Sequence, residues 1–160
     1  MRKLTVLVTI IALFIGCSTQ HGVEAETQQH LETQVPRPGY AQQDNLDICE
    51  AVFRYLFKHN ASKVQQKAKS YFITIFKQDP SDEFLARFTG NNPPVRKGSD
   101  FAIGEGLVFS IGSIIRIGED TAQVCGGYYE TGLSSSGNIY TVVRKNGLWV
   151  VENDEMLWIS

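Results

Sequence analysis

The most regular pattern of apolar and polar positions in this chain lies between residues 44 and 60. Charged side chains recur there every fourth residue and apolar side chains take the opposite side, which is the pattern of an amphipathic helix. Asp44 or Asn45 can accept hydrogen bonds from the free amides of a first helical turn. The pattern therefore predicts a helix that starts near Asp44 or Asn45, ends near His59-Asn60 and lies across a sheet.

Period-two alternation takes over in the second half of the chain, where one set of odd positions is apolar: Leu107, Phe109, Ile111, Ile115 and Ile117. Such alternation indicates strands with one covered face, and Asn146-Gly147 is the strongest short signal for a hairpin turn. Aromatic and β-branched residues at 71–76 indicate one further, earlier strand. The later strands are expected as an antiparallel meander over residues 107–117, 121–130, 139–144, 148–152 and 156–160.

Between these elements, helix-capping and chain-breaking residues predict a short helix and two loops. Asp79 and Pro80 suit the cap and the first position of a helix that carries Phe84 and Phe88 and that Gly90 closes. Loops are expected over residues 91–100 and 131–138, which are rich in Gly, Pro, Asn and Ser.

Helix, strand, short helix and meander together predict a single α+β domain over residues 44–160. We expect N-terminal helices packed on a curved antiparallel β-meander. This order resembles the cone-shaped folds related to nuclear transport factor 2. A cystatin-like arrangement, with one helix on a sheet, is the alternative.

Several strings also resemble a family of small uncharacterised bacterial exported proteins. They are DPSDEFLARF, NNPPVRKGSDF, GGYYETGLSSSGN and the closing WVVENDEMLWIS. That family has no catalytic residues to transfer to this chain, so the resemblance implies export and a small domain but no reaction.

The first 16 residues have the features of a signal peptide. Arg2 and Lys3 precede a 13-residue uncharged run, Leu4 to Gly16, which is too short to span a bilayer as a helix. The run ends at Cys17 in a segment that resembles the lipobox of bacterial lipoproteins, in which the Cys is acylated and becomes the new N-terminus. We therefore expect a membrane-anchored lipoprotein of the cell envelope.

In a Gram-negative host, Ser18 after the Cys resembles an outer-membrane address. The polar segment 17–43 then forms a flexible tether. The alternative is cleavage near Ala25, which would discard Cys17 and release a secreted domain.

Charge excludes one class of partner. Without Arg2 and Lys3 the chain keeps 13 basic residues against 17 acidic ones, and no basic cluster forms a footprint for phosphates. Nucleic acid is therefore not expected as a partner.

Cysteine usage leaves two alternatives open. If Cys17 is acylated, Cys49 and Cys125 remain as a possible disulfide in an oxidising compartment. The other interpretation is two buried free thiols that act as small apolar residues. No Cys and His spacing resembles a zinc site, and no metal or cofactor is expected.

Candidate ligand-binding residues gather in Gly126-Gly127-Tyr128-Tyr129-Glu130. Two glycines inside a strand mark a bulge or a close approach, and the tyrosines offer flat rings with hydroxyl groups. Tyr128, Tyr129 and Glu130 are therefore candidates, although a curved strand with packed tyrosines and a solvated Glu130 would look the same. His59 is a further candidate, with a helix-terminal role as the alternative.

No catalytic constellation is assembled in the sequence, so the leading hypothesis is an envelope module that binds a small molecule or another protein on the concave sheet face. The membrane is a partner through the N-terminal lipid. A second hypothesis is a cone-fold enzyme of the isomerase, dehydratase or hydrolase kind, with Glu130, Asp154 or His59 acting beside a tyrosine. A third is a structural spacer domain, which predicts no pocket.

Overall fold

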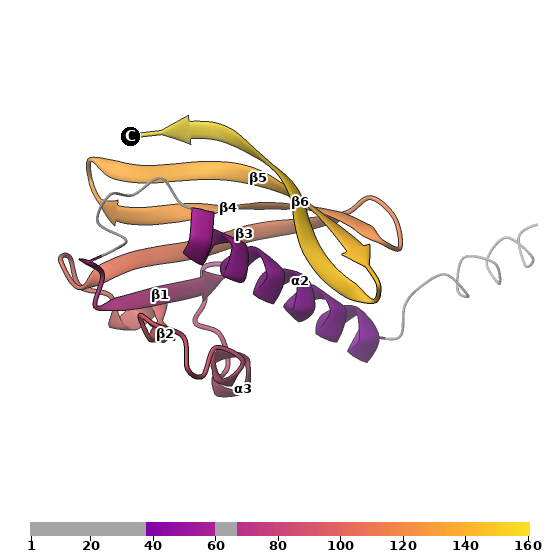
Figure 1. The fold of residues 1–160 in the computed structure, drawn as a ribbon, viewed down its shortest axis with the longest axis horizontal. Coiled ribbons are helices and arrows are strands. Elements are labelled where there is room, and N and C mark those ends of the chain that lie inside the picture. The colour runs from indigo at the N-terminus through magenta and orange to yellow at the C-terminus, as the bar shows by residue number, and fades with distance from the viewer. Residues whose placement is uncertain (1–37, 60–66) are drawn as a thin grey trace, which may run out of the picture. The chain divides into compact units, whose positions relative to one another are not determined.

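A long helix lies against one face of a six-stranded sheet in the computed structural model (Figure 1), which describes residues 38–59 and 67–160. The predicted signal peptide, Cys17 and most of the predicted tether lie outside these residues. The elements are helix α2 (Pro38–His59), β1 (Ser70–Ile75), α3 (Asp82–Ala86), β2 (Val95–Lys97), a 3-10 turn η2 (Gly98–Asp100), β3 (Gly106–Arg116), β4 (Thr121–Thr131), β5 (Ser134–Lys145) and β6 (Leu148–Ile159).

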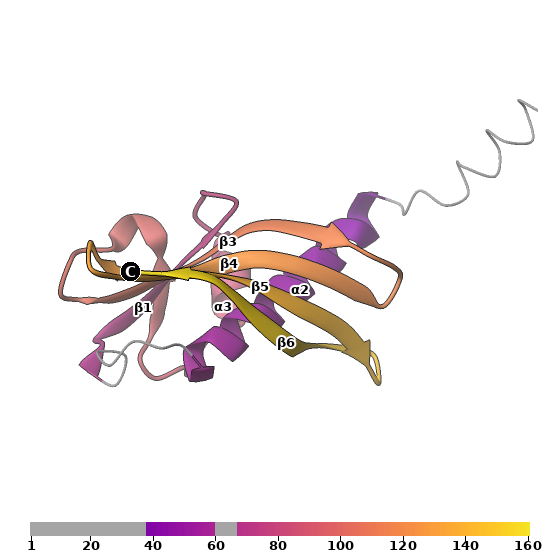
Figure 2. The same ribbon diagram turned by 90° about the horizontal axis from the view of Figure 1, so that it is seen from above.

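The strand order is β2-β1-β3-β4-β5-β6. Strands β3 to β6 form the expected antiparallel meander, whereas β1 runs parallel to both β2 and β3. The long strands twist strongly along their length, as the view from above shows (Figure 2). The α+β class, with a helix packed on a mostly antiparallel sheet, is thereby confirmed.

The inner face of the sheet, defined here as the face that packs against α2, holds the hydrophobic core. Ile48, Val52 and Phe53 of α2 are fully buried against side chains of β3 and its neighbours. Four rings, Phe53, Phe57, Phe84 and Phe88, contact one another edge to face or stacked, with centroids 5.5–6.3 Å apart. The predicted amphipathic helix is confirmed, and α3 adds its Phe84 to the same core.

The start of α2 was predicted wrongly. The helix begins at Pro38 rather than near Asp44 or Asn45, so the last six residues of the predicted tether are helical. Asp44 is not a cap: it accepts hydrogen bonds from Trp149 Nε1 at 2.8 Å and from the guanidinium groups of Arg116 and Arg144. Because the Asp44 carboxylate binds side chains of the sheet and does not cap a first helical turn, the residues before Asp44 can also be helical.

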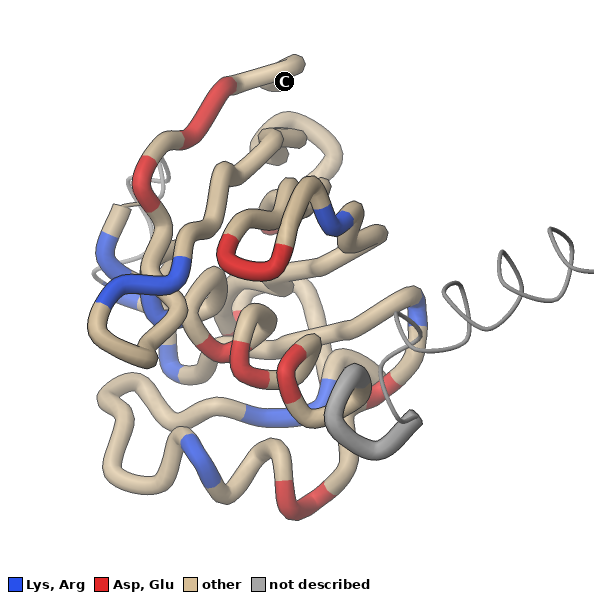
Figure 3. The backbone as a smooth tube through the Cα atoms, turned by 90° about the vertical axis from the view of Figure 1, so that its right-hand side faces the viewer, with Lys and Arg blue, Asp and Glu red and all other residues tan. Residues whose placement is uncertain are grey.

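Further along α2, acidic side chains hold the segment that follows α3. Arg87 Nη1 lies 2.8 Å from Asp47 Oδ1 and 3.0 Å from Glu50 Oε2, and Glu50 also binds Arg54 within the helix. Figure 3 shows the acidic positions along the central helical coil in red. The polar side of the helix is therefore used for internal ion pairs.

A bulge changes which side chains of β3 face the core. The register shifts between Ile111 and Ser113, after which Ile114 packs against the core and Ile115 is 57% exposed. Ile117, beyond the strand, is 59% exposed. The prediction that Ile115 and Ile117 share the covered face with Ile111 is wrong, because one extra residue reverses the parity.

Both predicted loops contain strand residues. Segment 91–100 includes β2, which pairs with β1 through Tyr71 and Val95, and segment 131–138 narrows to a two-residue turn before β5 begins at Ser134. Pairing with neighbours overrides the weak strand propensity of Ser and Gly there. The short helix is capped by Ser81 rather than Asp79. The Asn146-Gly147 hairpin is confirmed, with φ of 52° and 80°.

The two described cysteines lie on opposite sides of the sheet. Cys49 lies on α2 and is buried in the core, whereas Cys125 lies on the outer face of β4, and both are free thiols. The predicted possibility of a Cys49–Cys125 disulfide is contradicted, because the sheet itself separates the side chains. Burial raises the pKa of the Cys49 thiol to about 12. Among the described residues, no helix is both long and apolar enough to span a bilayer.

Candidate functional site

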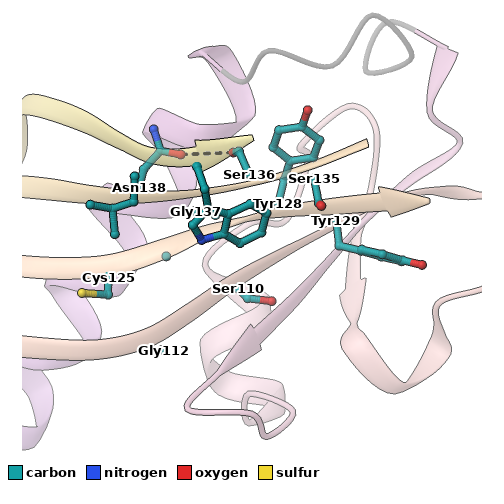
Figure 4. Close-up of a pocket in the computed structure, with 13 residues that line it drawn as sticks. Ser110, Gly112, Cys125, Tyr128, Tyr129, Ser135, Ser136, Gly137 and Asn138 are labelled. Carbon is teal, nitrogen blue, oxygen red and sulfur yellow. Dashed lines mark hydrogen bonds between the residues drawn. The ribbon is translucent and has the colours of Figure 1, made fainter. Parts of the chain in front are cut away.

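Strand β4 sends the two candidate tyrosines to opposite faces of the sheet. Tyr128 belongs to the buried core on the inner face, whereas Tyr129 is 40% exposed on the outer face. Figure 4 shows the two rings pointing away from each other. The sequence grouped them as one candidate site: both line a pocket on the outer face, and Tyr128 also lines a pocket on the inner face.

The inner pocket lies between the C-terminal half of α2 and strands β4 to β6, with a volume of about 230 Å³. The described residues that line it combine aromatic, polar and apolar side chains: Tyr55, Leu56, His59, Tyr128, Ser136, Asn138, Tyr140, Asp154 and Met156. The structure thus brings Tyr128 and His59 together with Asp154, the carboxylate of the second hypothesis.

Two phenols and one carboxylate form the polar centre of this pocket. Tyr55 donates its hydroxyl to Asp154 Oδ2 at 2.9 Å, and the Tyr55 and Tyr140 rings meet edge to face at 65°, with centroids 6.0 Å apart. Tyr140 stands opposite Asp154 in the β5–β6 register. Tyr140 is only 1% exposed, and its hydroxyl has no hydrogen-bond partner within residues 38–59 and 67–160.

The environment keeps both phenols protonated. Burial raises the pKa of Tyr140, and the nearby Asp154 and Tyr55 raise it further. Burial also raises the pKa of Tyr55, as does its hydrogen bond to Asp154. Both hydroxyl groups are therefore hydrogen-bond donors at neutral pH.

His59 closes one side of the pocket from the last turn of α2. Its ring stacks on Tyr55 with centroids 4.3 Å apart, and its Nδ1 lies 3.0 Å from the Tyr55 carbonyl oxygen. A carbonyl only accepts, so Nδ1 carries the hydrogen and Nε2 is the nitrogen left to accept. The ring is exposed, and the hydrogen bond to the last helical turn agrees with the helix-terminal interpretation.

Two buried polar side chains on β5 complete the inner surface. Ser136 donates its hydroxyl to Asn138 Oδ1 at 3.1 Å, which Figure 4 draws as a dashed line. This bond assigns the carbonyl end of the amide to Ser136, so the Asn138 amide nitrogen is the end left to donate. No described residue accepts from it. Asn138 therefore adds a second donor beside Tyr140.

Glu130 lies outside this group. It is buried, and its Oε2 accepts the Ser134 hydroxyl at 2.9 Å across the β4–β5 turn. Neither the solvated rim charge nor the pocket base expected from the sequence fits this position. Its carboxylate instead links the two ends of the β4–β5 turn.

Sequence reasoning missed Tyr55, Tyr140, Ser136 and Asn138. Tyr55 lies four residues before His59, which was a usable signal that the two share one side of the helix. Ser136 and Asn138 gave no such signal, because 134–138 read as a loop, and Tyr140 lay in the predicted strand 139–144 without an assigned face. Their alternation becomes informative only after the pairing of β5 with β4 is known.

Comparison with known proteins gave no relatives: no family model matches the chain, and no curated protein or solved structure is significantly similar to it. The resemblance to exported bacterial proteins stays a prediction. Among the described residues, no group of three or more His, Cys, Asp or Glu side chains could hold a metal ion.

Proposed function

We propose that this chain is an exported binding module that holds a small polar molecule in the inner pocket. The observation that carries the proposal is the Tyr140 hydroxyl, which lines the pocket and has no hydrogen-bond partner among the described residues. A phenol hydroxyl at a pocket wall can donate a hydrogen bond to an acceptor oxygen of a ligand.

The remaining groups define the ligand. Asp154 Oδ2 takes the Tyr55 hydroxyl, and its Oδ1, which no described residue contacts, can accept from a ligand hydroxyl or amine. Leu56 and Met156 offer an apolar wall. The volume of about 230 Å³ equals that of about eight water molecules at ~30 Å³ each. The pocket therefore suits a molecule of amino-acid size that carries a hydroxyl or amine next to an acceptor oxygen.

A nuclear magnetic resonance screen tests this proposal. The ¹⁵N-labelled domain is titrated with small alcohols, amines and amino acids, and hits are repeated with Tyr140→Phe and Asp154→Asn. We expect each variant to weaken binding at least tenfold while the fold is retained. Tyr71→Phe is the matched control, because that buried ring lies in the core away from the pocket. Hits that bind both pocket variants as tightly as the wild type would refute the proposal that the inner pocket is the binding site.

Export and lipidation at Cys17 form the second part of the proposal. The support is the basic start, the 13-residue apolar run and the Cys that ends it. The cone-shaped arrangement related to nuclear transport factor 2 is also part of the proposal. It agrees with a binding module, since such folds hold ligands between helix and sheet. The intact mass of the protein from a bacterial membrane fraction, with Cys17→Ser as control, tests the anchor. An acylated chain that starts at Cys17 is expected. A chain that starts at Glu26 would show that the protein is secreted without a lipid anchor.

A cone-fold enzyme is the second candidate, because His59 and Asp154 line one pocket together with three tyrosines. The raised pKa values of Tyr55 and Tyr140 argue against either phenol as the acid. Turnover of a bound hit that is lost in His59→Gln, with binding retained, would favour the enzyme over the module. The spacer hypothesis predicts no pocket and gains no support from this surface.

A further inference from the structure

A second pocket lies on the outer face of the sheet, on the side away from α2. It has a volume of about 400 Å³ and is open to solvent above β3 to β6. Figure 4 shows it from the open side, with Cys125, Ser110 and Tyr129 around it. Tyr128, Ser136 and Asn138 line both pockets, whereas Tyr55, Tyr140 and Asp154 line only the inner one, so the outer pocket needs an explanation of its own.

Strand register explains why the sheet is hollow here. Across the outer face, Ser110 of β3 pairs with Gly127 of β4, Gly127 with Gly137 of β5, and Gly137 with Trp158 of β6. Ser110 and Trp158 are three strand spacings apart, which is a distance of about 14 Å across the sheet. The two middle positions carry no side chain, so the backbone itself forms the floor.

Two aromatic rings border this floor and remain accessible. Trp158 lies over Gly137, where an added Cβ would come within 2.3 Å of its Nε1, yet the residue is 52% exposed. Tyr129 stands beside the floor, 40% exposed, and its ring is held by Phe101 at a centroid distance of 6.1 Å. Both rings thus present surface to solvent from fixed positions.

The polar groups around the floor are hydroxyl and N–H groups without charge. Ser110 Oγ accepts from Thr74 at 2.9 Å and keeps its own hydrogen to donate, and Ser135 pairs with Ser160 at 2.7 Å. The Trp158 indole N–H makes no hydrogen bond with a described residue. No Asp, Glu, Lys or Arg lines this pocket in the described part of the chain.

We propose that the outer pocket binds a neutral pyranose ring of an oligosaccharide. A sugar ring has an apolar face of C–H groups and a rim of hydroxyls, which matches an aromatic platform on Trp158 and Tyr129 with serine hydroxyls at its edge. The uncharged lining disfavours ionic ligands. An aromatic peptide side chain would fit the floor but would leave these hydroxyl and N–H groups without partners.

The test is a fluorescence and calorimetric titration of the whole domain with neutral oligosaccharides, chitopentaose and cellopentaose. Trp158 is one of two tryptophans in the chain, so binding changes its emission. Trp158→Ala is expected to weaken binding at least tenfold. Gly112→Leu fills the pocket and should abolish binding, because its Cβ meets only Cys125 O at 3.7 Å and the backbone tolerates it.

Gly118→Leu is the matched control, since nothing lies within 4 Å of its Cβ and the residue is outside the pocket. It should bind as the wild type does. Two results would overturn the proposal: no millimolar binding of either sugar, or equal binding by Gly112→Leu. Binding of an aromatic peptide but not of sugars, again lost in Gly112→Leu, would reassign the pocket to a protein partner. None of these results depends on Tyr140 or Asp154, so failure here leaves the inner pocket untouched.

Discussion

The two faces of one sheet hold two pockets that are built by opposite means. On the inner face, α2 covers the strands and the pocket is made of added polar groups, with Tyr55, Tyr140 and Asp154 at its centre. On the outer face the pocket exists because side chains are missing at Gly127 and Gly137. Alternation along β4 and β5 therefore lets one set of strands serve two surfaces of different chemistry.

The two faces also differ in how much they contribute to the stability of the fold. Core packing lies almost wholly on the inner face, whereas several large apolar side chains of the outer face and the end of β6 are about half exposed. Changes on the inner face should therefore affect folding strongly. Changes at exposed positions of the outer face should affect folding little.

The largest expected effect is on the core. Phe53→Ala removes a fully buried ring that contacts three other phenylalanines and should lower the free energy of unfolding by about 3–5 kcal/mol. Ile115→Ala, on the outer face, should lower it by less than ~0.5 kcal/mol. Urea denaturation measures both. Similar losses in the two variants would contradict the division between the faces.

A smaller effect is expected where the start of α2 meets the sheet. Burial alone would raise the pKa of Asp44, but the Trp149 and Arg116 hydrogen bonds and the charges of Arg116 and Arg144 outweigh it and hold the pKa below 3.8. Asp44→Asn should lower the free energy of unfolding by about 2 kcal/mol at pH 7. Glu119→Gln, on an exposed turn, is the control and should change it little.

The sign of the pH dependence follows from the lowered pKa of Asp44. The folded state favours the ionised carboxylate, so its contribution is complete above about pH 3.8 and is lost as pH falls through the lower folded pKa. The difference between wild type and Asp44→Asn should therefore shrink below pH 3.8. A difference that grows on acidification would show that Asp44 does not bind as described.

The smallest expected effect is that of a reductant. Cys49 and Cys125 are free thiols on opposite sides of the sheet, so dithiothreitol should leave the melting temperature of the domain unchanged. Calorimetry of the purified domain with and without reductant measures this. A fall of several degrees on reduction would require the disulfide that the sheet excludes.

The elements that depend on neighbouring residues in the sequence could be predicted from it. The amphipathic period gave α2, and Asn146-Gly147 gave the last hairpin. The bulge at Ile111/Ser113 could not be predicted, because it depends on the pairing of β3 with β4. The same limit applies to Ser134 to Asn138. This segment forms a strand because it pairs with β4 on one side and with β6 on the other.

The candidate sites show a related limit. Tyr128, His59 and Asp154 were named from their chemistry, but their grouping required three-dimensional pairing. Two register shifts along the β5–β6 pair, at Gly137/Asn138 and Thr141/Val142, place Asp154 opposite Tyr140 and Trp158 opposite Gly137. Without those shifts, sequence parity cannot assign the β6 side chains to faces.

The most direct test of the two-face account is one residue-resolved ¹H–¹⁵N titration of the wild-type domain, first with an inner-pocket hit from the small-molecule screen and then with chitopentaose. Two sets of shifted signals are predicted, which overlap only at the residues that line both pockets, Tyr128, Ser136 and Asn138. The small molecule should move Tyr55, Tyr140 and Asp154, and the sugar should move Gly127, Gly137 and the Trp158 indole. Shifts of Tyr55, Tyr140 and Asp154 by the sugar, or no shift of these residues by any small molecule, would contradict the assignment of the two ligands to two faces.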